Sequence, residues 1–177
     1  DLNSSHSSSS MQVIKHTLDN GLTVFLSPNH ETPRFYAEII TRAGSKHDPE
    51  TNTGLAHYLE HLLFKGTSSF GTIDFEKEKP LLDQITQLYE ERSAEQNETK
   101  REEIYKKINE ISIQAASFAV PNEMDRVYGN MGGKGINAHT WHEETVYKVD
   151  LPANRLIHWA KIESERFANP IFRLFHT

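Results

Sequence analysis

The chain has 177 residues, with 25 Asp and Glu against 19 Lys and Arg, ten His and no Cys. This length suits one domain, or a domain and a fraction of another. The lack of Cys excludes disulfides, a thiol nucleophile, iron–sulfur clusters and Cys-ligated zinc, so a bound metal would need His and carboxylate ligands. The net charge of −6 argues against a nucleic-acid-binding domain, and no apolar run reaches the ~20 residues of a membrane-spanning helix.

The first ten residues form a serine-rich stretch that lacks the apolar run of an intact signal peptide. We interpret residues 1–10 as a disordered tail, either a cloning remnant or a processed terminus, and residues 11–177 as the folded part. The composition leaves the compartment uncertain; a periplasmic or secreted location is favoured over a cytoplasmic one.

Regular patterning begins with short strands. Val13 with Ile14, and then residues 22–26, predict two strands joined by the turn Asp19-Asn20-Gly21, in which glycine supplies a positive φ. Strict alternation over residues 35–41 predicts a third strand with one wholly apolar face and one mixed face.

Helical spacing follows over residues 54–64, where leucines recur at i, i+4, i+7 and i+8: Leu55, Leu59, Leu62 and Leu63. Gly66 is placed to stop this helix. We expect the leucine face to pack on a core.

Two further amphipathic helices are predicted between Pro80 and Phe118, the first beginning with Pro80 at its N-terminus. A polar turn over residues 93–98 makes them a helical hairpin, with apolar positions Leu81, Leu82, Ile85, Leu88, Tyr89, Ile104, Tyr105, Ile108 and Ile111. We interpret the hairpin, at about residues 78–120, as a local insertion that packs on its host domain. A coiled-coil interaction arm is the alternative.

The remaining pattern predicts a helix over residues 122–131, strands over 136–140 and 145–151, and a last helix over 152–168. In the last helix the apolar positions are Leu156, Ile157, Trp159 and Ala160.

Three residues of the helix over 54–64 form the pattern H-x-x-E-H: His57, Glu60 and His61. At ~100° per residue the two imidazoles lie one turn apart and can reach one ion, with the carboxylate beside them. The leucine face is centred nearly opposite, so we expect these polar side chains to face a cleft. Two neutral imidazoles are good zinc ligands, although a catalytic zinc needs a third protein ligand and an open position. Zinc lowers the pKa of a bound water to ~7, and a nearby carboxylate can then act as general base.

Six segments stand in a particular order along the chain: residues 19–24, 43–45, 54–61, 64–67, 137–140 and 166–172. Together they resemble the segments of the pitrilysin/insulinase family of zinc metallopeptidases, the inverzincins. The resemblance covers about residues 12–177, and it implies that residues 11–177 are the N-terminal part of a peptidase catalytic domain in a longer chain.

The resemblance implies an α+β half-unit with an antiparallel sheet flanked by helices, here carrying the helical hairpin and lacking the end of the unit. Active members of the family pair several such units into a chamber that admits unfolded peptides. The expected partners are therefore a peptide substrate and the remaining domains of the parent chain.

Carried over residue by residue, the resemblance makes His57 and His61 zinc ligands and Glu60 the general base. It also makes Asn137, Ala138 and His139 a sheet edge to which a substrate strand adds by backbone pairing. His139 stands where an aromatic residue is usual, and Trp141 where a small one is usual. The side-chain preference of the substrate pocket near the cleaved bond therefore stays open.

The family's third zinc ligand is a glutamate on a helix that we expect beyond Thr177. Glu163 and Glu165 are interpreted as solvated charges on a helix face. The predicted function is a zinc-dependent metalloendopeptidase for unfolded peptides or small proteins, whose isolated fragment binds Zn²⁺ weakly or not at all and is inactive. Two alternatives stay open: a non-catalytic structural or partner subunit of the same family, and a helical-hairpin interaction module.

Overall fold

In the computed structural model of the chain, residues 12–173 are described, and the chain divides into two units, residues 1–33 and 34–177. The predicted tail over residues 1–10 lies outside the described residues. In the first unit β1 (Ile14–Thr17) pairs antiparallel with β2 (Thr23–Leu26). Gly21 in the connecting turn has φ +87°, which confirms the predicted hairpin.

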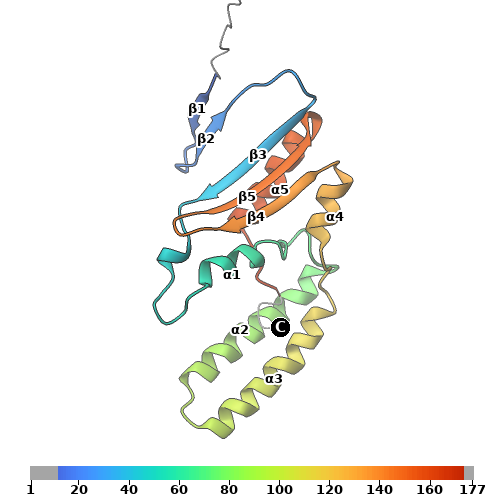
Figure 1. The fold of residues 1–177 in the computed structure, drawn as a ribbon. Coiled ribbons are helices and arrows are strands. Elements are labelled where there is room, and N and C mark those ends of the chain that lie inside the picture. Colours follow the sequence, from blue (N-terminus) through green and yellow to red (C-terminus); the bar gives the residue numbers. More distant parts are fainter. Residues whose placement is uncertain (1–11, 174–177) are drawn as a thin grey trace, which may run out of the picture. The chain divides into compact units, whose positions relative to one another are not determined.

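The second unit is built on a three-stranded antiparallel sheet in the order β3-β5-β4 (Figure 1). Its strands are β3 (Arg34–Thr41), β4 (Lys134–Thr140) and β5 (Thr145–Pro152). In the central strand β5 five of the eight residues are buried and the other three are half-buried. In β3 half-buried and exposed side chains alternate along most of the strand, as its sequence predicts. Among the described strands β4 pairs only with β5, so its other side is a sheet edge.

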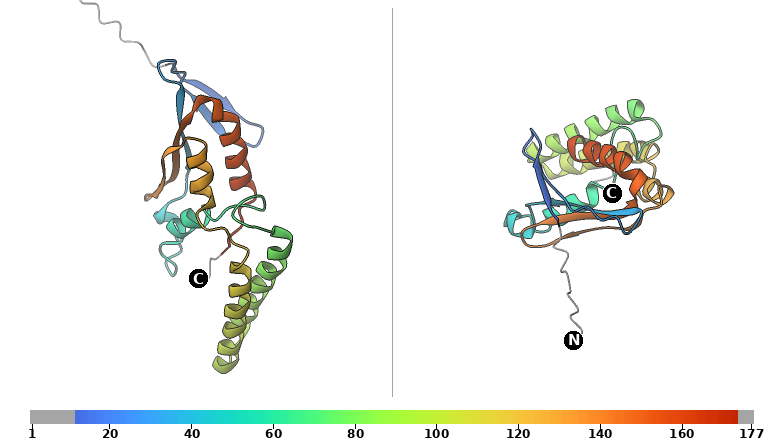
Figure 2. Two further views of the ribbon diagram at one scale, coloured as in Figure 1. Left: turned by 90° about the vertical axis from the view of Figure 1, so that its right-hand side faces the viewer. Right: turned by 90° about the horizontal axis from the view of Figure 1, so that it is seen from above.

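Helices α4 (Glu123–Asn130) and α5 (Leu156–Ala168) cover one face of this sheet (Figure 2). The core between them contains Met124 and Tyr128 from α4 and Val149 and Leu151 from β5, all buried. This arrangement is an α+β fold with an antiparallel sheet and flanking helices, as the sequence indicates.

The apolar face predicted for the last helix is wrong in part. Leu156, Ile157 and Ala160 are exposed. Trp159 packs against the core as predicted, together with Ile162. Further along the same side, α5 buries two charged residues, Glu163 and Arg166, that hydropathy assigns to the surface.

Helices α2 (Phe75–Ala94) and α3 (Glu98–Ala116) form the predicted helical hairpin. Ile85, Ile108 and Ala115 are its buried core, with six of the other predicted apolar side chains packed around them. The predicted start of the first helix is wrong: Pro80 lies inside α2 rather than at its N-terminus. Asp74 caps the helix, because its side chain accepts a 3.2 Å hydrogen bond from the Lys77 N–H, and this cap begins α2 before the proline.

The two ends of the hairpin lie side by side. Thr72 and Ala119 form an isolated antiparallel bridge, supported by a 2.9 Å hydrogen bond from Ile73 N to Phe118 O and a 3.0 Å bond from Val120 N to Gly71 O. This is the geometry that an insertion into a host domain requires. That the hairpin is an insertion stays a prediction.

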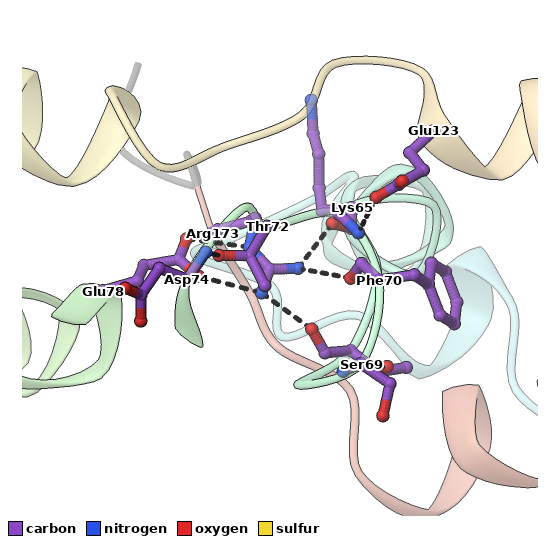
Figure 3. Close-up of polar contacts among 10 residues, drawn as sticks. Lys65, Ser69, Phe70, Thr72, Asp74, Glu78, Glu123 and Arg173 are labelled. Atoms are coloured by element: carbon purple, nitrogen blue, oxygen red, sulfur yellow. Dashed lines mark hydrogen bonds and ion pairs between the residues drawn. The ribbon is translucent and has the colours of Figure 1, made fainter. Parts of the chain in front are cut away.

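Arg173 ties the base of the hairpin to the loop after the first helix of the unit (Figure 3). Its guanidinium is buried and makes two hydrogen bonds to the equally buried Glu78 of α2, at 2.8 and 3.0 Å. It also donates to the backbone carbonyls of Lys65 and Thr67, at 2.8 and 2.7 Å. Gly66 permits this close approach: it has φ +102°, and a Cβ there would lie 2.3 Å from a backbone oxygen and 2.9 Å from the guanidinium.

None of the helices in the described part of the chain combines the length and the apolar composition that a membrane crossing needs.

The buried pair predicts a large loss of stability in Glu78→Gln. Removing one partner leaves the Arg173 charge buried without compensation, and we expect the free energy of unfolding to fall by about 3–5 kcal/mol. Asp83→Asn is the matched control, because the Lys79–Asp83 pair on the same helix is exposed and its loss should cost about 0.5 kcal/mol or less. Urea unfolding of the two variants measures the difference, and equal losses would contradict the role assigned to Arg173.

Candidate functional site

The H-x-x-E-H residues lie on α1 (Leu55–Leu62), a helix of eight residues that packs against β4 and β5. Its N-terminus is capped from a distance by Asp48. The two carboxylate oxygens of Asp48 accept hydrogen bonds from the backbone N–H groups of Gly54 and Ala56, at 2.7 and 2.8 Å. These bonds satisfy N–H groups that a helix start leaves unpaired, and the negative charge is favourable there.

His57 and His61 lie side by side on the exposed part of α1. Their Nε2 atoms are 3.1 Å apart and their ring centroids 4.8 Å apart. Two nitrogens bound to one tetrahedral zinc, each at about 2.0–2.1 Å, would lie about 3.3 Å apart. The pair therefore fits two positions of a zinc site with little movement.

Glu60 does not share the exposure of the two histidines. Only 6% of it is accessible, while Leu55 and Leu59 are 41% and 40% exposed. Leu62 of the predicted leucine face is buried and Leu63 is half-buried, so the prediction that α1 packs through this face is right in part. The prediction that all three polar residues face away from the core is wrong for Glu60. The buried side of α1 contains Glu60 together with Leu62.

The burial of Glu60 is possible because the carboxylate has a hydrogen-bond donor. The hydroxyl of Thr140, the last residue of β4, donates to Glu60 Oε2 at 2.6 Å. Behind it lies Thr145, whose Oγ1 is 3.3 Å from that of Thr140 and donates to Ala43 O at 2.9 Å. No sequence motif gives Thr140 a role, although the residue closes the segment 137–140 that carries the family resemblance.

The predicted substrate-binding residues stand on the edge strand. Asn137, Ala138 and His139 lie in β4 and pair with Lys148, Tyr147 and Val146 of β5, respectively. Their strand is the one that reaches Glu60 through Thr140. The structure therefore brings the predicted edge and the predicted base together, and it leaves their roles as predictions.

Beyond the C-terminal end of α1, Arg166 lies among three aromatic rings. Its guanidinium carbon is 5.3, 4.7 and 4.9 Å from the ring centroids of Phe64, Tyr147 and Phe167, a set of cation–π contacts. Phe64 follows His61 by three residues, so this stack supports the end of the helix that carries the histidines.

Glu163 neutralises Arg166 from the same helix. Its carboxylate accepts a 3.0 Å hydrogen bond from Arg166 Nε and another from the hydroxyl of Tyr128. Glu165 accepts a hydrogen bond from the Thr67 hydroxyl, which lowers its pKa. The prediction that Glu163 and Glu165 are solvated charges is therefore wrong, because both are held by partners inside the unit.

A cavity of about 240 Å³ lies beside His61, between the end of α1, the loop after it and residues 119–125. Phe64, Phe70 and Met124 contribute apolar walls, and Glu123 and Asp125 contribute carboxylates. Of the three motif residues only His61 lines it, so this cavity is not the common cleft that the sequence predicts.

Within residues 12–173 no group of three or more His, Asp or Glu side chains is placed to hold one metal ion.

The comparison with known families bears on this site directly. The sequence model of the family described as Insulinase (Peptidase family M16) matches residues 23–79, which contain all of α1. Over this segment, about a third of its length, the chain is similar to the insulinase family, M16. Protease 3 of Escherichia coli (strain K12) is a peptidase of related sequence, 37% identical over 57 residues that cover 32% of this chain and 6% of Protease 3.

Two solved structures share the fold of this chain. A protease from Helicobacter pylori aligns with a TM-score of 0.61 and 20% identity over 93% of this chain and 27% of that protein. Pitrilysin aligns with a TM-score of 0.59 and 18% identity over 93% of this chain and 12% of pitrilysin. The chain therefore spans a small part of the length of the relatives it matches.

The ring stack around Arg166 predicts a pH dependence of stability. Burial raises the pKa of Tyr147 to about 12, against the opposing charge of Arg166. Between its ordinary pKa of about 10 and this value, the unfolded state has lost the phenol proton while the folded state keeps it. The free energy of unfolding should therefore fall as the pH rises through this window.

In Tyr147→Phe this contribution is absent, so the variant should lose less stability than the wild type between pH 10 and pH 12. Urea unfolding at several pH values measures the two slopes. Parallel slopes would mean that the phenol is not held in its neutral form by the fold.

Proposed function

We propose that this chain carries the first two zinc ligands and the general base of a zinc-dependent metalloendopeptidase that cleaves unfolded peptides. The observation that carries the proposal is the 3.1 Å separation of His57 Nε2 and His61 Nε2, with Glu60 one residue before His61 on a helix inside the matched M16 segment. The two nitrogens would hold the metal. When bound, zinc would act as a Lewis acid that polarises water and the peptide carbonyl.

Glu60 would move the protons of the reaction. Its carboxylate takes a proton from the attacking water and delivers it to the leaving amine, the usual work of a general base that then acts as a general acid. Its low exposure supports this role, because a carboxylate shielded from solvent is not surrounded by competing water.

The substrate would bind along β4. An unfolded peptide can add to the free edge at Asn137, Ala138 and His139 through backbone hydrogen bonds, which depend little on side-chain identity. Broad recognition of extended peptides follows, since backbone pairing needs a segment that is free to adopt a strand.

We place the third zinc ligand on a glutamate beyond Thr177, in the part of the family unit that would follow the described residues. On this proposal the 177-residue chain by itself binds zinc weakly or not at all and has no useful peptidase activity.

The test compares two variants in the intact protein. Glu60→Gln should retain zinc and lower kcat for hydrolysis of an unfolded peptide by about 10²- to 10⁴-fold. His57→Ala should lose both zinc and hydrolysis. Metal analysis of the purified proteins and a fluorogenic peptide assay measure the two quantities.

Wild-type activity in Glu60→Gln, or unchanged metal content in His57→Ala, would overturn the proposal. A wild-type protein that binds zinc through the two histidines and hydrolyses no peptide would instead be a non-catalytic subunit of the same family.

A further inference from the structure

We infer that Thr140 is a positioning residue for the Glu60 base, an inference that rests on the proposed function. The Thr140 hydroxyl donates to Glu60 Oε2 at 2.6 Å, and the Glu60 carboxylate makes no other hydrogen bond with the residues that the structure describes. A single bond from β4 therefore determines how this buried carboxylate is oriented.

The direction of this hydrogen bond follows from the neighbours of Thr140. A hydroxyl has one hydrogen to donate, and that of Thr145 goes to the carbonyl of Ala43 at 2.9 Å. An ionised carboxylate can only accept, so the hydrogen of Thr140 goes to Glu60. The Thr145 oxygen, 3.3 Å from Thr140 Oγ1, limits the positions that the Thr140 side chain can adopt on its other side.

This arrangement makes the two oxygens of the Glu60 carboxylate inequivalent. Oε2 accepts the Thr140 hydrogen bond, which lowers its basicity, so we assign Oε1 as the oxygen that takes and returns the proton. Holding a base in one orientation reduces the freedom that it must lose before proton transfer. The contribution of Thr140 is therefore expected in kcat rather than in peptide affinity.

The position of Thr140 in the chain adds a second reason. It directly follows Asn137, Ala138 and His139, the edge at which we propose that the peptide pairs. One strand then holds both the peptide backbone and the base, so the distance between them is governed by the rigidity of β4 rather than by a loop.

The test uses Thr140→Val, which keeps the shape of the side chain and removes the hydroxyl, together with Thr140→Ser, which keeps the hydroxyl. In the intact protein we expect Thr140→Val to lower kcat at least tenfold with KM changed less than twofold and with zinc content unchanged. Thr140→Ser should recover most of kcat. Thr41→Val is the matched control, because the Thr41 hydroxyl donates to a backbone carbonyl of β5 at 3.1 Å and does not contact Glu60.

A measurement on zinc-free protein tests the contact without any catalysis. Thr140→Val should lower the midpoint of urea unfolding less in a Glu60→Ala background than in the wild type, because its partner is already absent. Equal shifts in the two backgrounds would show that the pair does not interact and would overturn the inference.

The outcomes separate this inference from the proposed function. Full hydrolysis by Glu60→Gln would remove the proposed function and the inference with it. An inactive Glu60→Gln beside a Thr140→Val variant with wild-type kcat would overturn the role of Thr140 alone, as would a Thr140→Ser variant no more active than Thr140→Val.

Discussion

The burial of one carboxylate, that of Glu60, sets the rotation of α1 and with it the position of both histidines. A buried carboxylate without a hydrogen-bond donor would be strongly unfavourable, so α1 is stable in this orientation only where the Thr140 hydroxyl meets it. With Glu60 turned to the sheet, the helical geometry leaves His57 and His61 on the exposed side, one turn apart. One orientation of α1 therefore accounts for both the buried Glu60 carboxylate and the exposed His57 and His61 imidazoles.

Two guanidinium groups stabilise the surroundings of that helix. Arg166 is held by Glu163 and packs on Phe64 just beyond the histidines, while Arg173 binds the backbone of the loop that follows. Both come from the C-terminal part of the described chain, far in sequence from α1. The surroundings of the histidine helix thus depend on two arginines distant from it in sequence as well as on its neighbouring strands.

Much of this fold could be predicted from sequence because its signals are local. The glycine turn at residues 19–21, the alternation along β3 and the apolar spacing of α2 and α3 each reflect a period that a short window contains. The H-x-x-E-H spacing likewise brings the two imidazoles together in any helix, whatever the helix packs against.

The errors arose where a partner distant in sequence decides the outcome. Hydropathy favours burying Leu55 and Leu59. It does not include the hydrogen bond to Glu60 from Thr140, which lies 80 residues further along the chain. The same reason explains the wrong prediction that Glu163 is a solvated charge. Its hydrogen-bond donors, Tyr128 and Arg166, meet the carboxylate only in the folded unit. The start of α2 is a different case, because two local signals compete there: the capping residue Asp74, which begins the helix, and Pro80, a residue that favours a first helical turn.

The central claim is that His57 and His61 together hold a zinc ion beside the Glu60 base. The most direct measurement is a crystal structure of the intact protein with zinc, with anomalous diffraction recorded at the zinc absorption edge. The account predicts one anomalous peak at about 2.0–2.1 Å from both Nε2 atoms, with the Glu60 carboxylate outside the ligand set and still bonded to Thr140. A zinc peak elsewhere with none between the two imidazoles, or a zinc ion ligated by Glu60, would contradict it.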